Sequence, residues 1–218
     1  MGSLLLDLIP ELLGMAITPA AIAGCILLLQ TKQALKNALA FASAFMLAYI
    51  AIGVAALLGG ATHQTQQSGT IAHWAGLVVG LIFVGCGVGT LVRHRSAAQR
   101  DPKWMDLLEK ATPRVAFLLG AALSVLNPNL AIMVSGMSVI AAADTTVATS
   151  IGATVLLLVA AALDFLVPIG AYVAFGDRAK AALESSKRWM LTHNGGLSMA
   201  VFFGFGALFV IRGVVALV

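Results

Sequence analysis

Charged residues are scarce in this sequence. Only 10% of its 218 residues are charged, whereas 60% are hydrophobic, and the mean hydropathy is +0.99. A soluble globular domain carries about 25% charged residues, so this chain lacks the polar surface that water requires. The scarcity excludes an ordinary soluble domain and predicts an all-α integral membrane protein, with residues 1–218 forming a single transmembrane domain.

Cysteines are few, and metal-binding and catalytic motifs are missing. The two cysteines, Cys25 and Cys86, lie in separate apolar stretches, where packing is a more common role than redox pairing. The four histidines are scattered, and neither HxxxH nor CxxC spacing occurs, so we predict no metal site and no cofactor. Because HExxH and a nucleophile–base pair are also missing, we do not expect an enzyme.

Long apolar stretches, in contrast, fill most of the chain. A helix that crosses a bilayer needs roughly 20 predominantly apolar residues. Six stretches meet this length, at 4–30, 37–60, 74–92, 114–142, 148–175 and 196–217. The first contains Asp7 and Glu11 and has no basic segment before it, so we predict a retained helix rather than a signal peptide.

The basic residues are distributed unevenly between the predicted connections. All but one of the 13 lysines and arginines lie in or beside the segments 31–36, 93–114 and 177–193. The connections near 61–73 and 143–147 contain none. By the positive-inside rule, the three basic loops are predicted to be cytoplasmic and both termini to lie outside. This distribution accounts for the net charge of +4 without a nucleic-acid partner.

Two pairs of matching segments indicate an internal repeat. "MAITPAAIAG" and "SVLNPNLAIM" are centred on Pro19 and Pro128, half the chain length apart, and "GCGVGTLVR" from Gly85 resembles "GFGALFVIR" from Gly204. Each half then holds three spans, and because three is odd, the second half must enter the membrane upside down. Inverted repeats of this kind are typical of secondary transporters. The two repeats are expected at about 1–93 and about 114–218, joined by the loop at about 93–114.

The two prolines predict broken helices inside the membrane. Proline removes a backbone hydrogen bond, and in lipid the freed groups must find a local partner or face a cavity. Polar side chains stand beside both prolines. They predict a paired substrate site between the halves, although simple kinks with locally repaired backbones remain the alternative. The predicted site residues are Thr18, Pro19, Asn127, Pro128 and Asn129.

Two of the three carboxylates within predicted spans, Asp164 and Glu11, have a predicted role. Asp164, in "VAAALDFLVPIGAY", lies near the middle of the fifth span, where a charged side chain costs ~2.5 kcal/mol or more. It is predicted to exchange a coupling proton, or alternatively to be a protonated residue that bonds a neighbouring helix. Glu11 is predicted either to line an outward vestibule or to lie at the membrane interface.

Longer segments carry a family resemblance. "DPKWMDLLEKATPRVAFLLGAALSVLNPNLAIM" resembles the central segment of the glycolipid-addressing proteins of mycobacteria and relatives, within the LysE-type exporter superfamily. "GMAITPAAIAG" and "RWMLTHNGGLSMAVFFGFGALFVIRG" resemble that family's first and last spans. The resemblance implies six helices, an inverted repeat and export across the plasma membrane. The family's Asn-Pro element commonly continues with lysine, a position that is Asn129 here.

These observations predict a proton-coupled secondary exporter that works by alternating access. The resemblance favours a glycolipid or other lipid-like substrate, and an amino acid or similar small metabolite is the alternative. A non-transporting scaffold for a larger lipid-export system also stays open. The expected partners are membrane lipids and the substrate, with a second copy of the chain or a lipid-export protein as further candidates.

Overall fold

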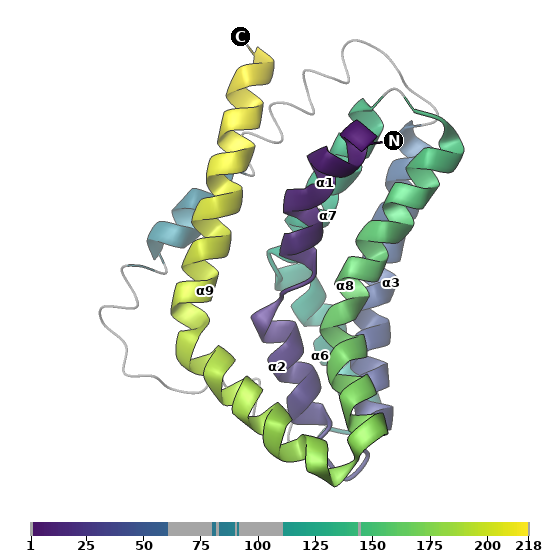
Figure 1. The fold of residues 1–218 in the computed structure, drawn as a ribbon, viewed down its shortest axis with the longest axis vertical. Coiled ribbons are helices and arrows are strands. Elements are labelled where there is room, and N and C mark those ends of the chain that lie inside the picture. Colours follow the sequence, from purple (N-terminus) through teal and green to yellow (C-terminus); the bar gives the residue numbers. More distant parts are fainter. Residues whose placement is uncertain are drawn as a thin grey trace.

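The computed structural model describes residues 2–60, 80–81, 83–89, 91, 111–143 and 145–217. Within these residues all regular secondary structure is helical (Figure 1). The helices are α1 (Gly2–Met15), α2 (Pro19–Leu28), α3 (Ala34–Gly60), α6 (Pro113–Leu126), α7 (Asn129–Ala142), α8 (Val147–Phe175) and α9 (Asp177–Leu217). The predicted outer loop at 61–73 and most of the cytoplasmic loop at 93–114 lie outside the described residues.

Both predicted helix breaks occur at the prolines. A residue that precedes proline is restricted to extended backbone, which cannot continue a helix. Thr18 accordingly has φ −110° and ψ 96°, and Asn127 has φ −80° and ψ 135°. The first apolar stretch is therefore bent by 45° between α1 and α2, and the fourth by 58° between α6 and α7.

Two uninterrupted helices have the length and composition of membrane spans. α3 and α8 are both apolar and long enough to span a bilayer, which confirms the spans predicted at 37–60 and 148–175. If each bent pair counts as one span, the described residues hold up to four. Six spans and the inverted repeat remain predictions.

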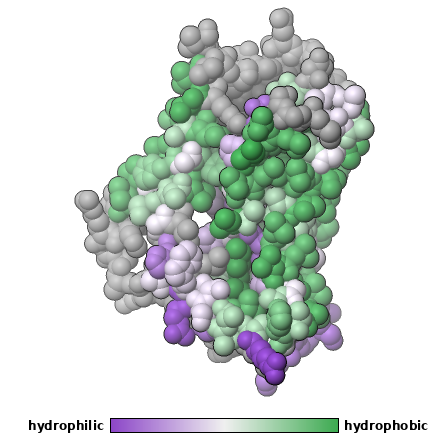
Figure 2. Space-filling model, in the orientation of Figure 1, coloured by the Kyte–Doolittle hydropathy of each residue, from purple (hydrophilic) through white to green (hydrophobic). Residues whose placement is uncertain are grey.

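An aromatic cluster and close glycine contacts hold the bundle together. Phe41, Phe45 and Phe165 join α3 to α8, with ring centroids 5.0–6.0 Å apart. Gly120 of α6 packs so closely that a Cβ there would lie 2.7 Å from the carbonyl oxygen of Phe41. Many large apolar side chains are exposed on the outside (Figure 2), as expected for a surface that lipid covers.

The described part of the predicted third span packs against α9. A Cβ at Gly80 would lie 2.9 Å from Cβ of Phe209, and the ring of Phe83 lies 5.7 Å from that of Phe202. Small glycine residues allow the two helices to approach this closely. The rest of the span at 74–92 lies outside the described residues.

The structure corrects the interpretation of 177–193 as a cytoplasmic loop. This segment is helical and forms the first part of α9. It contains no proline, has no glycine before Gly195, and is rich in Ala, Leu, Glu, Lys and Arg, which are strong helix formers. Figure 1 shows this part of α9 crossing one end of the bundle before the helix turns along its side.

The described parts of the three basic segments lie at that same end of the bundle. The Asn37 amide donates to Oγ1 of Thr31 and to the backbone oxygen of Ala111, both at 2.8 Å, which joins the start of α3 to the start of α6. Gln30, just beyond α2, bonds Glu184 of α9. We call this end the basic end, and its assignment to the cytoplasm remains a prediction.

Candidate functional site

The two helix breaks lie side by side inside the bundle. Nδ2 of Asn129 donates a hydrogen bond to Oγ1 of Thr18, although the two residues are far apart in sequence. The side chains are 3% and 4% exposed, so the contact is shielded from the surroundings. The structure thus brings together one predicted site residue from each half of the chain.

Asp164 joins this pair from α8. The backbone N–H of Thr18 donates to Oδ1 of Asp164 at 3.1 Å. Asp164 is 3% exposed. Thr18, Asn129 and Asp164 therefore form one buried network, here called the central network, that ties both breaks to an unbroken helix.

Helix geometry favours negative charge at the central network. Thr18 stands at the N-cap position of α2, without a side-chain capping bond, and Asn129 is the first residue of α7. The first N–H groups of a helix lack partners within it and carry partial positive charge. Because α2 and α7 both begin here, an anionic or strongly polar group is stabilised between them. Asp164 is one such group, because its carboxyl accepts a hydrogen bond from the Thr18 N–H at the start of α2.

The two asparagines beside Pro128 have different roles. Oδ1 of Asn127 accepts a hydrogen bond from the backbone N–H of Asn129 at 3.1 Å, so Asn127 repairs the backbone next to the break. Asn129 instead reaches across to Thr18. Pro19 and Pro128 are half-buried and contribute the breaks themselves. Local repair therefore accounts for Asn127 but not for Asn129.

Glu11 lies in the interior between the two helices that point away from the basic end. Its side chain is 0% exposed, and its Oε1 accepts a hydrogen bond from Oγ of Ser135 at 3.0 Å. This contact ties α1 to α7 about two turns from the central network. We call it the distal contact.

Tyr49 is a site neighbour to which the sequence analysis gave no role. It is 2% exposed, its ring meets that of Phe45 edge-on at a centroid distance of 6.2 Å, and it lies in the neighbourhood of Asp164. Its position was visible in the sequence, because Phe41, Phe45 and Tyr49 recur every four residues and so share one face of α3. Tyrosine's preference for membrane interfaces obscured that signal.

The cysteines do not form a pair. Cys25 is buried, whereas Cys86 is exposed. No disulfide joins them. Within the part of the chain that the structure describes, no cluster of His, Cys, Asp and Glu could hold a metal ion.

A second polar cluster ties α2 to α9 at the basic end. Nε2 of Gln30 donates to Oε2 of Glu184, Nζ of Lys187 lies 3.0 Å from the same oxygen, and Nζ of Lys187 donates to Oε1 of Gln30 at 3.4 Å. Lys187 is 9% exposed. We call these three residues the basic-end cluster. The sequence analysis missed it because 177–193 was expected to be a loop, although Glu184 and Lys187 have the spacing of a helical ion pair.

The basic-end cluster predicts a pH-dependent stability. Burial raises the pKa of the Glu184 carboxyl, but hydrogen bonds from Lys187 and Gln30 and the charges of Lys187 and Arg188 lower it more, so the pKa lies below its ordinary value of 4.5. A carboxyl whose pKa is lowered by folding stabilises the protein above its unfolded pKa, and that contribution is lost as the pH falls through the folded pKa. We expect wild type to melt slightly above Glu184→Gln at pH 7, and we expect this difference in melting temperature to shrink as the pH falls below 4.5.

Thermal unfolding of both proteins in one detergent, measured from pH 7 down to pH 3, checks this expectation. Ser185→Ala is the matched control, since that exposed hydroxyl bonds only within its own helix turn. The difference in melting temperature between Ser185→Ala and wild type should not change with pH. If the melting temperatures of Glu184→Gln and wild type differ by the same amount from pH 7 down to pH 3, the lowered pKa of Glu184 is contradicted.

Comparison with known proteins gives one match. The sequence matches the family model described as Sap, sulfolipid-1-addressing protein, over residues 10–215. The matched part includes both helix breaks, the central network, the distal contact and the basic-end cluster. No curated protein and no solved structure matches the chain.

Proposed function

We propose, from the premise that this chain belongs to the sulfolipid-1-addressing protein family, that it exports a glycolipid or similar lipid-like molecule across the plasma membrane. In this proposal the chain is a secondary transporter that works by alternating access. Export is coupled to a proton that Asp164 exchanges.

The central network is the observation that carries the proposal. Polar groups and interrupted helices are costly inside a membrane, and they are tolerated where they line a path or bind a substrate. Here two interrupted helices from opposite halves of the chain meet at Thr18 and Asn129, and a buried carboxylate joins them. Broken helices whose ends meet in the interior are the substrate sites of several secondary transporters. Simple kinks would not require a connection between the breaks.

The distal contact and the basic-end cluster lie on opposite sides of the central network, as the two gates of an alternating-access transporter would. The distal contact closes the bundle between α1 and α7, and the basic-end cluster closes it between α2 and α9. Both are formed in this structure. In the proposed cycle, the basic-end cluster opens to admit substrate, and the distal contact opens to release it.

The chemistry of the site favours a polar head group attached to apolar chains. The Thr18 hydroxyl, the Asn129 amide and the Asp164 carboxylate match the hydroxyl groups of a sugar. Leu13 of α1 and Ile17 in the break itself are 63% and 55% exposed and offer an apolar surface beside the network. Figure 2 shows the surface hollowed between α9 and the region where α1 meets α2. A lipid could place its head group at the network and its chains along this apolar surface.

Lipid profiling of cells with and without this chain tests the proposal. We expect deletion to deplete one glycolipid from surface extracts and to raise its level inside the cell, and the wild-type chain to restore both. An amino acid trapped inside would instead indicate export of a small metabolite. Unchanged lipids and metabolites in all fractions would contradict export.

A further inference from the structure

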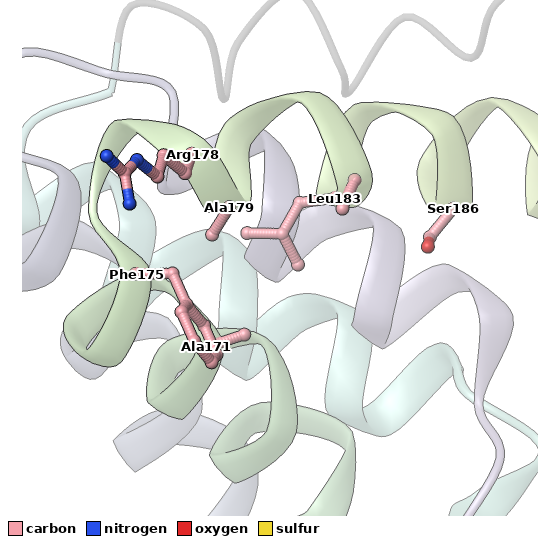
Figure 3. A pocket seen from close by; sticks show the side chains of 7 residues that line it. Ala171, Phe175, Arg178, Ala179, Leu183 and Ser186 are labelled. Carbon is pink, nitrogen blue, oxygen red and sulfur yellow. The ribbon is translucent and has the colours of Figure 1, made fainter.

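The turn between α8 and α9 contains a groove that the proposed transport cycle does not use. It has a volume of about 390 Å³. Ala171 and Phe175 line it from α8, and Arg178, Ala179 and Leu183 line it from α9, with Ser186 at the far end (Figure 3). From Arg178 to Ser186 the groove follows α9 for about 12 Å, at 1.5 Å per residue.

The groove has an apolar wall with one cation beside its end. Alanine, leucine and phenylalanine side chains form nearly all of the wall, and the Arg178 side chain extends from the end next to Phe175, with its guanidinium pointing outward (Figure 3). Phe175 is 67% exposed, so its ring is free to cover a bound chain. An elongated apolar ligand with an anionic group at one end complements this arrangement, because guanidinium binds phosphate through paired hydrogen bonds.

The position of the groove identifies where such a ligand comes from. α8 is long enough to cross the bilayer and ends at Phe175, and Gly176, with φ 54°, lets the chain reverse there. The groove therefore lies at the level of the lipid head groups. The neighbouring part of α9 exposes Trp189, which is 55% exposed, together with Arg178 and Arg188. Exposed tryptophan and arginine are typical of helices that lie in the membrane interface.

We propose that this groove binds an anionic phospholipid from the leaflet at the basic end. Arg178 binds the phosphate, and the apolar wall holds one acyl chain against Phe175 and Leu183. The bound lipid anchors the first part of α9 at the membrane surface. A free phosphate ion would leave the apolar wall uncovered, and a neutral lipid would leave Arg178 without a counter-charge. The inference does not rest on the transport proposal.

Lipid retention by the purified full-length chain tests the groove. The protein is reconstituted in bilayers of equal parts phosphatidylglycerol and phosphatidylcholine with identical chains, extracted in mild detergent, and its bound lipids are counted by mass spectrometry. We expect wild type to retain phosphatidylglycerol preferentially. Arg178→Gln should lower this preference about tenfold, as expected for the loss of a charge-assisted hydrogen bond. Ala182→Trp, which fills the groove, should abolish it.

Two matched variants separate the groove from a general surface effect. Arg188→Gln removes an exposed cation of α9 outside the groove, and Ala181→Trp adds the same bulk on an exposed position beside it. Both should keep the wild-type preference for phosphatidylglycerol.

Equal losses of this preference in Arg188→Gln and Arg178→Gln would overturn the proposal in favour of unspecific attraction to a basic surface. Retention that survives Ala182→Trp would also overturn it, as would a change of oligomeric state in that variant, because the groove would then be a protein interface. Since no transport is measured, failure here leaves the export proposal intact.

Discussion

Replacing Asp164 by asparagine is expected to abolish delivery of the exported lipid to the cell surface while the protein stays folded. Asparagine has nearly the same shape and keeps a side-chain oxygen that can accept the 3.1 Å hydrogen bond from the Thr18 backbone N–H. It cannot take up or release a proton. If export is coupled to a proton at this position, the variant binds substrate but cannot complete the cycle.

The measurement compares surface lipids of the deletion strain that carries wild type, Asp164→Asn or Asp7→Asn. Asp7→Asn makes the same chemical change at an exposed position of α1, outside the central network, and should restore surface lipid. Membrane amounts and melting temperatures of the three proteins show whether they are equally folded. Full restoration by Asp164→Asn would remove the proton-coupling role and favour a non-transporting scaffold.

Thr18→Val is expected to weaken both the fold and export. Valine matches threonine in shape but lacks the hydroxyl, so the buried Asn129 amide loses its acceptor. Leaving a buried polar group without a partner costs about 1–3 kcal/mol. The backbone hydrogen bond from residue 18 to Asp164 persists, because it does not involve the side chain. We therefore expect a folded protein with a lower melting temperature and export reduced about tenfold, the rate equivalent of this energy.

Two further threonine variants sharpen this test. Thr18→Ser keeps the hydroxyl and should retain most of the export and stability. Thr154→Val removes an equally buried hydroxyl from α8. That hydroxyl bonds the Ser150 backbone oxygen of its own helix and otherwise meets only the sulfur of Met137 in α7, a weak acceptor at 3.6 Å, so no amide of another helix loses a partner. Thr154→Val should change export little. If Thr18→Val behaves like Thr154→Val, the link between the two breaks has no functional importance.

Local chemistry made part of this architecture predictable. The restriction that proline places on the preceding residue is independent of the rest of the fold, so Thr18 and Asn127 could be predicted to interrupt their helices. The lengths of α3 and α8 follow from uninterrupted apolar composition in the same way. Asp164 was recognisable as a candidate because a carboxylate in an apolar stretch is costly wherever its helix packs.

Other features depended on neighbours that the sequence does not reveal. Helix propensity alone favoured a helix at 177–193, but the charged residues there suggested a loop until their packing across the bundle end was known. The partners of Glu184 and Lys187 include Gln30, which is distant in sequence and comes near only through the path of α9. The burial of Tyr49 likewise depends on the α3–α8 contact.

The sequence by itself determined that the chain is a helical membrane protein, where two of its helices break, and to which family it belongs. These properties follow from composition, from the fixed φ of proline and from motifs that are continuous in the chain. Only the tertiary structure decided that Asn127 repairs its own break, that Asn129 crosses to Thr18, and that Asp164 meets them both. The reason is physical: several side chains near each break could satisfy the freed backbone groups, and packing selects among them by the distances it sets.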